Sequence, residues 1–383
     1  MKKLLWSVMQ LLLAACVLTG AGSAFAETGV TDQRILLGQS AAFSGPAAQL
    51  GIQMHAGAKA YFDQINAQGG VFGRRIEIIQ ADDRYEAELA AANTKKLIEE
   101  SGVFALFGYV GTPTSNAALP VFTQANVPFF APFTGAQSLR EPFNRAVFSI
   151  RASYYDETAH LVERLVSTGI KNIAVFYQND AYGKSGLAGV ERAAKKMHIS
   201  LVEIATVERN STDVQAAVDK ILPKRPDAII QISAYASCAA YIKAMRRAGY
   251  FGQFYNVSFV GSQALADALG PQGQGVVISQ VMPFPWHSAT PVVAEYQKVM
   301  KKADIRTLNF SSLEGFMAAK VFTEGLRRAG RDLTREKLIK ALETINTGNY
   351  DAGGFDINFK PGDHGGSKFV DMTVIVKDGK FLN

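Results

Sequence analysis

Short apolar runs alternate with helix-length amphipathic stretches along most of the chain. The runs have the length and the β-branched and aromatic content of buried strands. Strand and helix in this repeated order predict parallel sheets covered by helices on both faces, and right-handed crossovers make such sheets doubly wound. We therefore predict an α/β fold. The expected strands are 35–37, 76–79, 103–107, 128–131, 173–177, 201–205, 228–232, 257–260 and 276–281, and the expected helices are 52–67, 86–101, 115–125, 155–168, 184–197, 212–222, 237–248, 291–302, 311–330 and 334–345.

The two ends of the chain depart from this alternation. Near the C-terminus, 353–359 and 368–376 are strand-like. At the N-terminus, residues 1–26 have the pattern of an export signal, with Lys2 and Lys3, an apolar stretch and the cleavage sequence Ala-Phe-Ala. A lipobox ending at Cys16 is the alternative, but the small and apolar residues up to 26 do not resemble a polar tether. We expect a soluble protein exported to the periplasm.

Length, cysteine content and charge limit the number of lobes, the disulfides and the partners that we expect. The exported part of the 383 residues exceeds the roughly 250–300 at which a single core stops growing, so two lobes are expected. Cleavage leaves Cys238 as the only cysteine, and one cysteine forms no intramolecular disulfide. The net charge is +6, with scattered basic residues. No basic run interleaves with aromatic residues, so we expect no nucleic-acid partner.

The tripeptide Gly183-Lys184-Ser185 ends like a nucleotide-binding P-loop. That motif requires a glycine five positions before Gly183, where this chain has Gln178. The sequence therefore does not predict an ATP site. The loop that carries Tyr182 still follows a predicted strand, and ligands of open parallel sheets bind at the carboxyl ends of strands.

Hydroxyl groups crowd the loops that follow two neighbouring strands. Thr112, Thr114 and Ser115 follow the strand at 103–107, and Thr134 follows the strand at 128–131. Each hydroxyl alone is explained by helix capping, but the group as a whole favours an anion site at a helix N-terminus. Four aromatic residues just past strand ends are either core residues or walls of a pocket: Phe43, Tyr109, Phe133 and Tyr182.

Signatures of catalysis are missing from the sequence. HExxH, CxxC and GxSxG do not occur, and the five histidines do not pair at metal-ligand spacing. The glycines at 270, 273 and 275 precede a strand, whereas a dinucleotide fingerprint follows one. We expect no enzyme, no cofactor and no metal.

Several longer stretches, taken in order, carry a family resemblance. They are "ILLGQSAAFSGPAAQLGIQMHAGAKAYFDQINAQGGVFGRRIEIIQADD", "GYVGTPTSNAALPVFTQANVPFFAPFTGA", "NDAYGKSGLAGV" and "NFSSLEGFMAAKVFTEGL". The chain resembles the periplasmic leucine/isoleucine/valine-binding protein family, the type I solute-binding proteins of ABC importers, from about residue 30 to the C-terminus.

The resemblance implies two doubly wound lobes joined by three crossing segments near 149–151, 281–283 and 353–355. Lobe 1 would comprise 27–149 and 283–353, and lobe 2 would comprise 150–282 and 354–383. The resemblance also implies a monomer that captures a small carboxylate-bearing molecule and delivers it to ABC permease and ATPase subunits. Thr112 and Thr134, with Phe133 beside them, would hold the carboxylate, and Tyr182 would close over it. A further tyrosine of the family aligns with either Ala234 or Tyr235 of this chain.

Two positions depart from the branched-chain members of that family. Ser258 stands where those members hold the ligand ammonium with an acid, and Leu50 replaces an aromatic wall residue. A buried ammonium without a counter-charge is expensive. Either another acid serves, with Asp180 and Glu314 as candidates, or the ligand is no simple α-amino acid.

Two other functions remain open. The chain is compatible with a ligand-sensing subunit of a membrane receptor. Genetic linkage to permease and ATPase genes would distinguish an importer subunit from such a sensor. A periplasmic enzyme would instead turn over its bound molecule.

Overall fold

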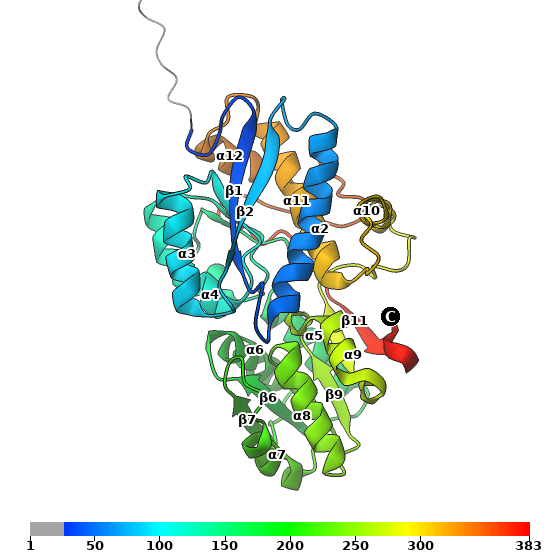
Figure 1. Cartoon of the computed structure of the whole chain (residues 1–383). Coiled ribbons are helices and arrows are strands. Elements are labelled where there is room, and N and C mark those ends of the chain that lie inside the picture. The colour runs from blue at the N-terminus through cyan, green and yellow to red at the C-terminus, as the bar shows by residue number, and fades with distance from the viewer. Residues whose placement is uncertain (1–26) are drawn as a thin grey trace, which may run out of the picture.

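The computed structural model describes residues 27–383, so the predicted export signal lies outside the described residues. The described part is a mixed α/β structure with two sheets, each flanked by helices, stacked one above the other (Figure 1). No helix within 27–383 is long and apolar enough to cross a membrane.

The first lobe is built on a parallel sheet of five strands in the order β2-β1-β3-β4-β5. Its strands are β1 (Arg34–Ala41), β2 (Arg75–Asp82), β3 (Ala105–Phe107), β4 (Phe129–Phe130) and β5 (Val147–Phe148). Its helices are α2 (Ala48–Ala67), α3 (Ala87–Glu99), α4 (Thr112–Gln124), α10 (Pro291–Lys302), α11 (Phe310–Ala329) and α12 (Arg335–Leu342), with the short η1 (Gln137–Leu139).

Side chains alternate across this sheet. Leu37 and Phe107 pack with the α2 and α11 side, whereas Leu36 and Leu106 pack with α3 and α4. Both faces are therefore covered, which explains why the strands read as unbroken apolar runs.

The second lobe is built on a sheet of seven strands in the order β12-β11-β10-β9-β8-β6-β7. Its strands are β6 (Ile173–Gln178), β7 (Glu203–Val207), β8 (Ala228–Ile232), β9 (Gln253–Asn256), β10 (Val277–Gln280), β11 (Asp371–Ile375) and β12 (Phe381–Leu382), of which β11 and β12 are antiparallel to their neighbours. Its helices are α5 (Tyr154–Ser167), α6 (Ala181–Lys196), α7 (Gln215–Ile221), α8 (Tyr235–Arg247) and α9 (Ser262–Leu269), with the short η2 (Leu222–Lys224), η3 (Ser258–Val260), η4 (Gly270–Gly273) and η5 (Lys377–Gly379).

Three segments of the described chain connect the lobes. The first joins β5 to α5, the second joins β10 to α10, and the third joins α12 to β11. In the third, Gly365 forms a parallel bridge with Ser149 of the first connection, and Gly366 N donates to Ser149 O at 2.7 Å. The third connection therefore runs along the first before it enters the second sheet. The residue boundaries of the two lobes stay an interpretation.

A close contact between two helices fixes part of the first lobe. A Cβ atom on Gly57 of α2 would lie 1.7 Å from the carbonyl oxygen of Ser312, and one on Gly315 of α11 would lie 1.9 Å from that of Met54. Only glycine permits this approach, so the backbones of α2 and α11 touch directly.

Two predicted strands are wrong. Residues 257–260 are mainly the 3₁₀-helix η3, because Ser258 N donates to the Glu157 carboxylate at 2.8 Å instead of to a neighbouring strand. Residues 353–359 form no strand. Gly353 and Gly354 both have positive φ and donate to the Asp351 carboxylate, which makes a turn.

Candidate functional site

Two threonines meet at the edge of the first sheet that faces the second lobe. Thr112 begins α4 after β3, and Thr134 follows β4, the neighbouring strand, so the two loops lie side by side. Their Oγ1 atoms are 2.7 Å apart, and Thr134 Oγ1 donates to the Tyr154 hydroxyl at 3.1 Å. Both threonines are buried. The α4 N-terminus adds backbone N–H groups and the positive end of a helix dipole.

Aromatic rings from both lobes pack beside these hydroxyls. Phe259 of the second lobe lies 5.7 Å from Phe133 and 5.8 Å from Tyr85 of the first lobe, measured between ring centroids. Tyr182, at the start of α6, lies 4.5 Å from Phe259 and 5.3 Å from Tyr154. Asp180 caps α6 by accepting from Tyr182 N at 2.9 Å, which fixes where α6 begins and so positions Tyr182.

A buried arginine links the lobes from the first connection. Arg151 Nη2 donates to Ser258 Oγ at 2.8 Å in the second lobe and to Glu314 Oε2 at 3.2 Å in the first. Its Nε lies 3.1 Å from Glu314 Oε1. The guanidinium carbon lies 4.6 Å from the centroid of the Phe133 ring, which is a cation–π arrangement.

A second buried acid lies on the other side of Ser258. Glu157 accepts from Ser258 N at 2.8 Å, from Ser258 Oγ at 3.0 Å and from Ser279 Oγ at 2.6 Å. Burial raises its pKa despite Arg151 and these hydrogen bonds. Burial also lowers the pKa of Arg151, but Glu314 and Glu157 outweigh this and raise it. Arg151 is therefore a fixed cation between two acids.

The lobes also touch where this buried region meets solvent. Arg209 Nη2 of the second lobe donates to Glu86 Oε2 of the first lobe at 2.7 Å, and Asn210 Nδ2 donates to Glu86 Oε1 at 2.8 Å. Gln49 N donates to the Tyr235 hydroxyl at 3.4 Å. These contacts between segments far apart in the sequence show a closed arrangement of the lobes.

Several buried polar atoms in this region have no hydrogen-bond partner within residues 27–383, among them Ser115 Oγ, Arg151 Nε and Nη1, Glu314 Oε1 and the Tyr182 hydroxyl. Buried polar groups are nearly always satisfied in proteins. These atoms come from α4, α11, the first connection and α6, so both lobes contribute buried polar groups without a partner. The arrangement suits a small polar or anionic molecule held between aromatic walls.

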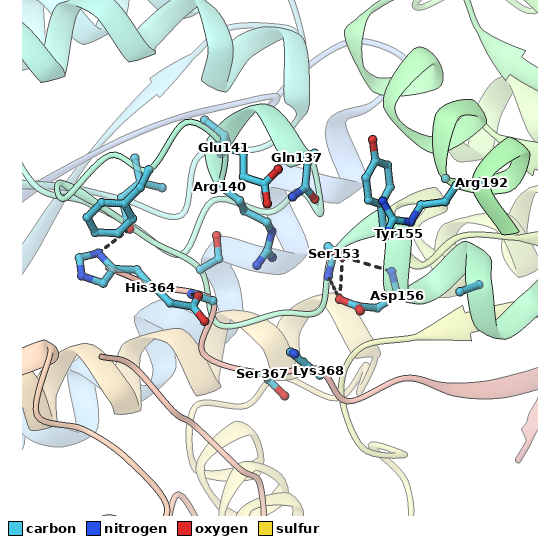
Figure 2. A pocket seen from close by; sticks show the side chains of 18 of the residues that line it. Gln137, Arg140, Glu141, Ser153, Tyr155, Asp156, Arg192, His364, Ser367 and Lys368 are labelled. Atoms are coloured by element: carbon cyan, nitrogen blue, oxygen red, sulfur yellow. Dashed lines mark hydrogen bonds between the residues drawn. The ribbon is translucent and has the colours of Figure 1, made fainter. Parts of the chain in front are cut away.

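A cavity of about 860 Å³ lies elsewhere, along the connecting segments. Figure 2 shows charged side chains around it, among them Arg140, Arg192 and Lys368. None of the site residues predicted from the sequence lines it. Its walls belong to both lobes and to the third connection, so its shape depends on how the lobes are oriented. We place the candidate site in the Thr112–Tyr182 region instead.

The structure does not bring all of the predicted site residues together. Tyr109 packs 4.9 Å from Phe129 in the core behind the sheet, and its hydroxyl is bonded to Thr94. Thr114 Oγ1 donates to the carbonyl oxygens of Val110 and Gly111 within its own turn.

Two more of the predicted residues, Phe43 and Tyr235, lie outside this region. Phe43 packs edge-on against His55 at 5.9 Å, on the lining of a separate surface pocket. Tyr235 lies at the contact with Gln49 between the lobes. Thr112, Phe133, Thr134, Tyr182 and Ser258 do lie within the region described above.

Sequence reasoning missed several residues of this region. Arg151 falls in a predicted crossing segment but has no predicted role, and Glu157, Tyr154, Tyr85 and Phe259 are absent from the predicted site. Arg151 lies six residues before Glu157, which falls on the buried side of α5, and this spacing is the signal that the sequence contains.

Comparison with known proteins shows which family the chain resembles. Residues 34–380 match the model of a family described as "Periplasmic binding protein". A Leu/Ile/Val-binding protein homolog 7 from Brucella suis is 26% identical over 362 residues, covering 88% of this chain and 86% of the relative.

Two solved structures are more similar in sequence. A possible leucine/isoleucine/valine-binding protein from Rhodopirellula baltica is 35% identical with a TM-score of 0.87, covering 93% of this chain and 98% of that one. A substrate-binding periplasmic protein from Ralstonia solanacearum is 32% identical with a TM-score of 0.85, covering 91% and 99%.

Proposed function

The chain belongs to the periplasmic binding protein family, and from that premise we propose that it captures a small carboxylate-bearing solute between its lobes and delivers it to an ABC importer. The observation that carries the proposal is that Tyr182 of the second lobe packs on Tyr154, whose hydroxyl is bonded to the Thr112–Thr134 pair. A solute held by both lobes stabilises their closed arrangement, and closure is what a membrane partner is able to recognise.

The first lobe supplies the anion-binding half of the site. A carboxylate beside Thr112 Oγ1 and Thr134 Oγ1 would accept hydrogen bonds from hydroxyls and from the N–H groups that begin α4. Each hydrogen bond to a charged group contributes about 1.5–3 kcal/mol when water is excluded. The second lobe closes over the ligand with Tyr182 and Phe259, whose rings remove it from solvent.

The cellular setting follows from the same premise. The family is extracytoplasmic, and residues 1–26 would direct export to the periplasm, where the protein would act as a soluble monomer. Its partners would be the permease and ATPase subunits of the importer. The solute would be released unchanged, because its carboxylate is bound and no bond is made or broken.

A screen by thermal unfolding tests the proposal. Small carboxylates with and without an amino group, together with the matching amides, are added singly to the purified protein. A carboxylate at 100 times its dissociation constant should add about 2.7 kcal/mol to the free energy of unfolding, whereas its amide should add little. Calorimetry and recovery of the unchanged ligand complete the test. A ligand that is consumed, or a screen in which no carboxylate stabilises the protein, would refute the proposal.

A further inference from the structure

The buried charges between the lobes bear on the chemical class of the ligand. Arg151, Glu157 and Glu314 are at most 2% exposed. Two acids and one base form the cluster, and a buried charge needs a partner. Which of these groups still has capacity to bind a ligand is decided by the contacts each already makes.

Both acids are already engaged. The two carboxylate oxygens of Glu157 accept three hydrogen bonds from Ser258 and Ser279. Glu314 forms an ion pair with Arg151: its Oε2 accepts a hydrogen bond from Nη2 at 3.2 Å, and its Oε1 lies 3.1 Å from Nε without a hydrogen bond. A ligand ammonium that sought either acid would have to displace Arg151 or break the Glu157 hydrogen bonds.

Asp180, the remaining acid that the sequence suggested for an ammonium, is engaged as well. Its Oδ1 accepts from Tyr182 N at 2.9 Å and Gly183 N at 3.3 Å. Its Oδ2 accepts from Gln178 Nε2 at 2.6 Å and lies 3.6 Å from Arg209 Nη1. Asp180 is thus committed to the start of α6 and to the contact between the lobes.

The base, by contrast, has spare donors. A guanidinium carries five N–H groups, and Nη1 of Arg151 has no partner within the described residues. The ring of Phe133, over which Arg151 lies, belongs to the residue directly before Thr134. Free donors of the cation, threonine hydroxyls and the α4 N-terminus therefore lie in one region, and all of them favour an anion.

We infer that the site selects carboxylates that lack an α-ammonium group, and that Arg151 is the residue that excludes the ammonium. The inference rests on the proposed function. The tail of such an acid would lie among Tyr85, Phe133, Tyr182 and Phe259, so an aromatic or branched aliphatic acid is the expected class. Arg151 is paired with Glu314, one of the two acids that an ammonium would otherwise require, and Ser258 and Ser279 bind the other.

Matched pairs of ligands test this directly. 4-Methylpentanoate and leucine differ only by the ammonium, as do 3-phenylpropanoate and phenylalanine. Calorimetry on the purified full chain at pH 7.5 should show at least one of the deaminated acids binding, and its amino acid binding at least about 100-fold more weakly, because a buried ammonium without a counter-charge loses two decades or more of affinity.

The outcomes separate this inference from the proposed function. An amino acid that binds as tightly as its deaminated partner, or more tightly, would overturn the inference and leave the proposed function standing. Failure of every carboxylate in the wider screen would overturn both. Deaminated acids that bind with the expected preference support both.

A variant tests the role of Arg151 itself. Arg151→Met combined with Glu314→Gln removes the pair without leaving a lone charge at these two positions, and Lys196→Met with Glu163→Gln removes a surface pair as the matched control. If circular dichroism shows that the first variant folds, its preference for deaminated acids should shrink at least about tenfold, whereas the control should keep it. An unchanged preference would overturn the assignment of Arg151. If the variant does not fold, the ligand pairs with the unaltered protein decide the inference.

Discussion

Nε of Arg151 lies 3.1 Å from Oε1 of Glu314, although the two residues are 163 positions apart in the sequence. Arg151 belongs to the first connection between the lobes, and Glu314 belongs to α11 of the first lobe. Arg151 also donates to Ser258 of the second lobe. A single side chain therefore joins both lobes and one of their connections at the candidate site.

Arg151→Ala should lower the free energy of unfolding by about 3–5 kcal/mol, because it leaves Glu157 and Glu314 buried without their cation. Equilibrium denaturation in urea at pH 8 measures the loss. Arg151→Met with Glu314→Gln should recover part of it, because one of the two acids is then neutral. If Arg151→Ala is as stable as the wild type, Arg151 does not neutralise Glu157 and Glu314.

The stability of the protein should depend on pH through Glu314. Burial raises its pKa to about 7, with Arg151 opposing the rise and Glu157 adding to it, whereas the ordinary value of 4.5 applies to the unfolded chain. Between pH 4.5 and 7 the folded form holds a proton that the unfolded form has lost. The contribution of this group to the free energy of unfolding therefore falls as pH rises through that window, by at most about 1.4 kcal/mol per pH unit.

Glu314→Gln removes this contribution, so comparison of the two proteins isolates it. Urea denaturation at pH 5, 6 and 7 and constant ionic strength should show the wild type losing stability relative to the variant as pH rises. A difference that stays flat, or that rises with pH, would contradict the raised pKa.

Thr134→Ala should weaken binding of the cognate carboxylate by about 1–3 kcal/mol, a factor of about 5 to 150, because a hydroxyl at the anion-binding position is lost. Thr114→Ala is the matched control, since the Thr114 hydroxyl is bonded to backbone carbonyls of its own turn. Calorimetry with the same ligand compares the two. Equal losses in both variants would place the carboxylate elsewhere.

Glu86→Ala should speed release of the ligand, because Glu86 accepts from Arg209 and Asn210 across the mouth of the site. The pair is partly exposed, so a loss of about 0.2–1 kcal/mol is expected, which is a factor of about 1.4 to 5 in affinity. Stopped-flow fluorescence at low and high salt measures it, and salt should reduce the difference from the wild type. Glu163→Ala, which removes a surface ion pair within the second lobe, should leave release unchanged. An identical effect in both variants would argue against a role for Glu86 in closure.

The order of strands and helices was predictable because the central strands, such as β1, β3 and β8, are buried on both faces of a sheet. The alternation predicts the α/β class, which the two sheets confirm. The prediction is wrong at 257–260, where the apolar pattern resembles a strand but Glu157, about a hundred residues earlier in the chain, captures the backbone N–H of Ser258. Local sequence carries no record of such a distant partner.

The candidate site was predictable only in part, and for the same reason. Hydroxyls after neighbouring strands indicated that Thr112 and Thr134 would approach each other, because adjacent parallel strands bring their following loops together. The approach of Arg151 to Glu314 and Ser258 depends on how a connection between the lobes packs, which no periodicity reports. Tyr109 shows the reverse case, since a residue just past a strand end turned into the core behind the sheet.

The glycine contact between α2 and α11 has a consequence for how the molecule moves. Because the two backbones touch at Gly57 and Gly315, neither helix is free to slide past the other without collision, and tilting them apart would open a void in the packing. Glu314, next to Gly315, is therefore anchored to the scaffold of its lobe. A change between an open and a shut form therefore has to occur through backbone torsions in the three connecting segments. The α2–α11 layer would move as a rigid body.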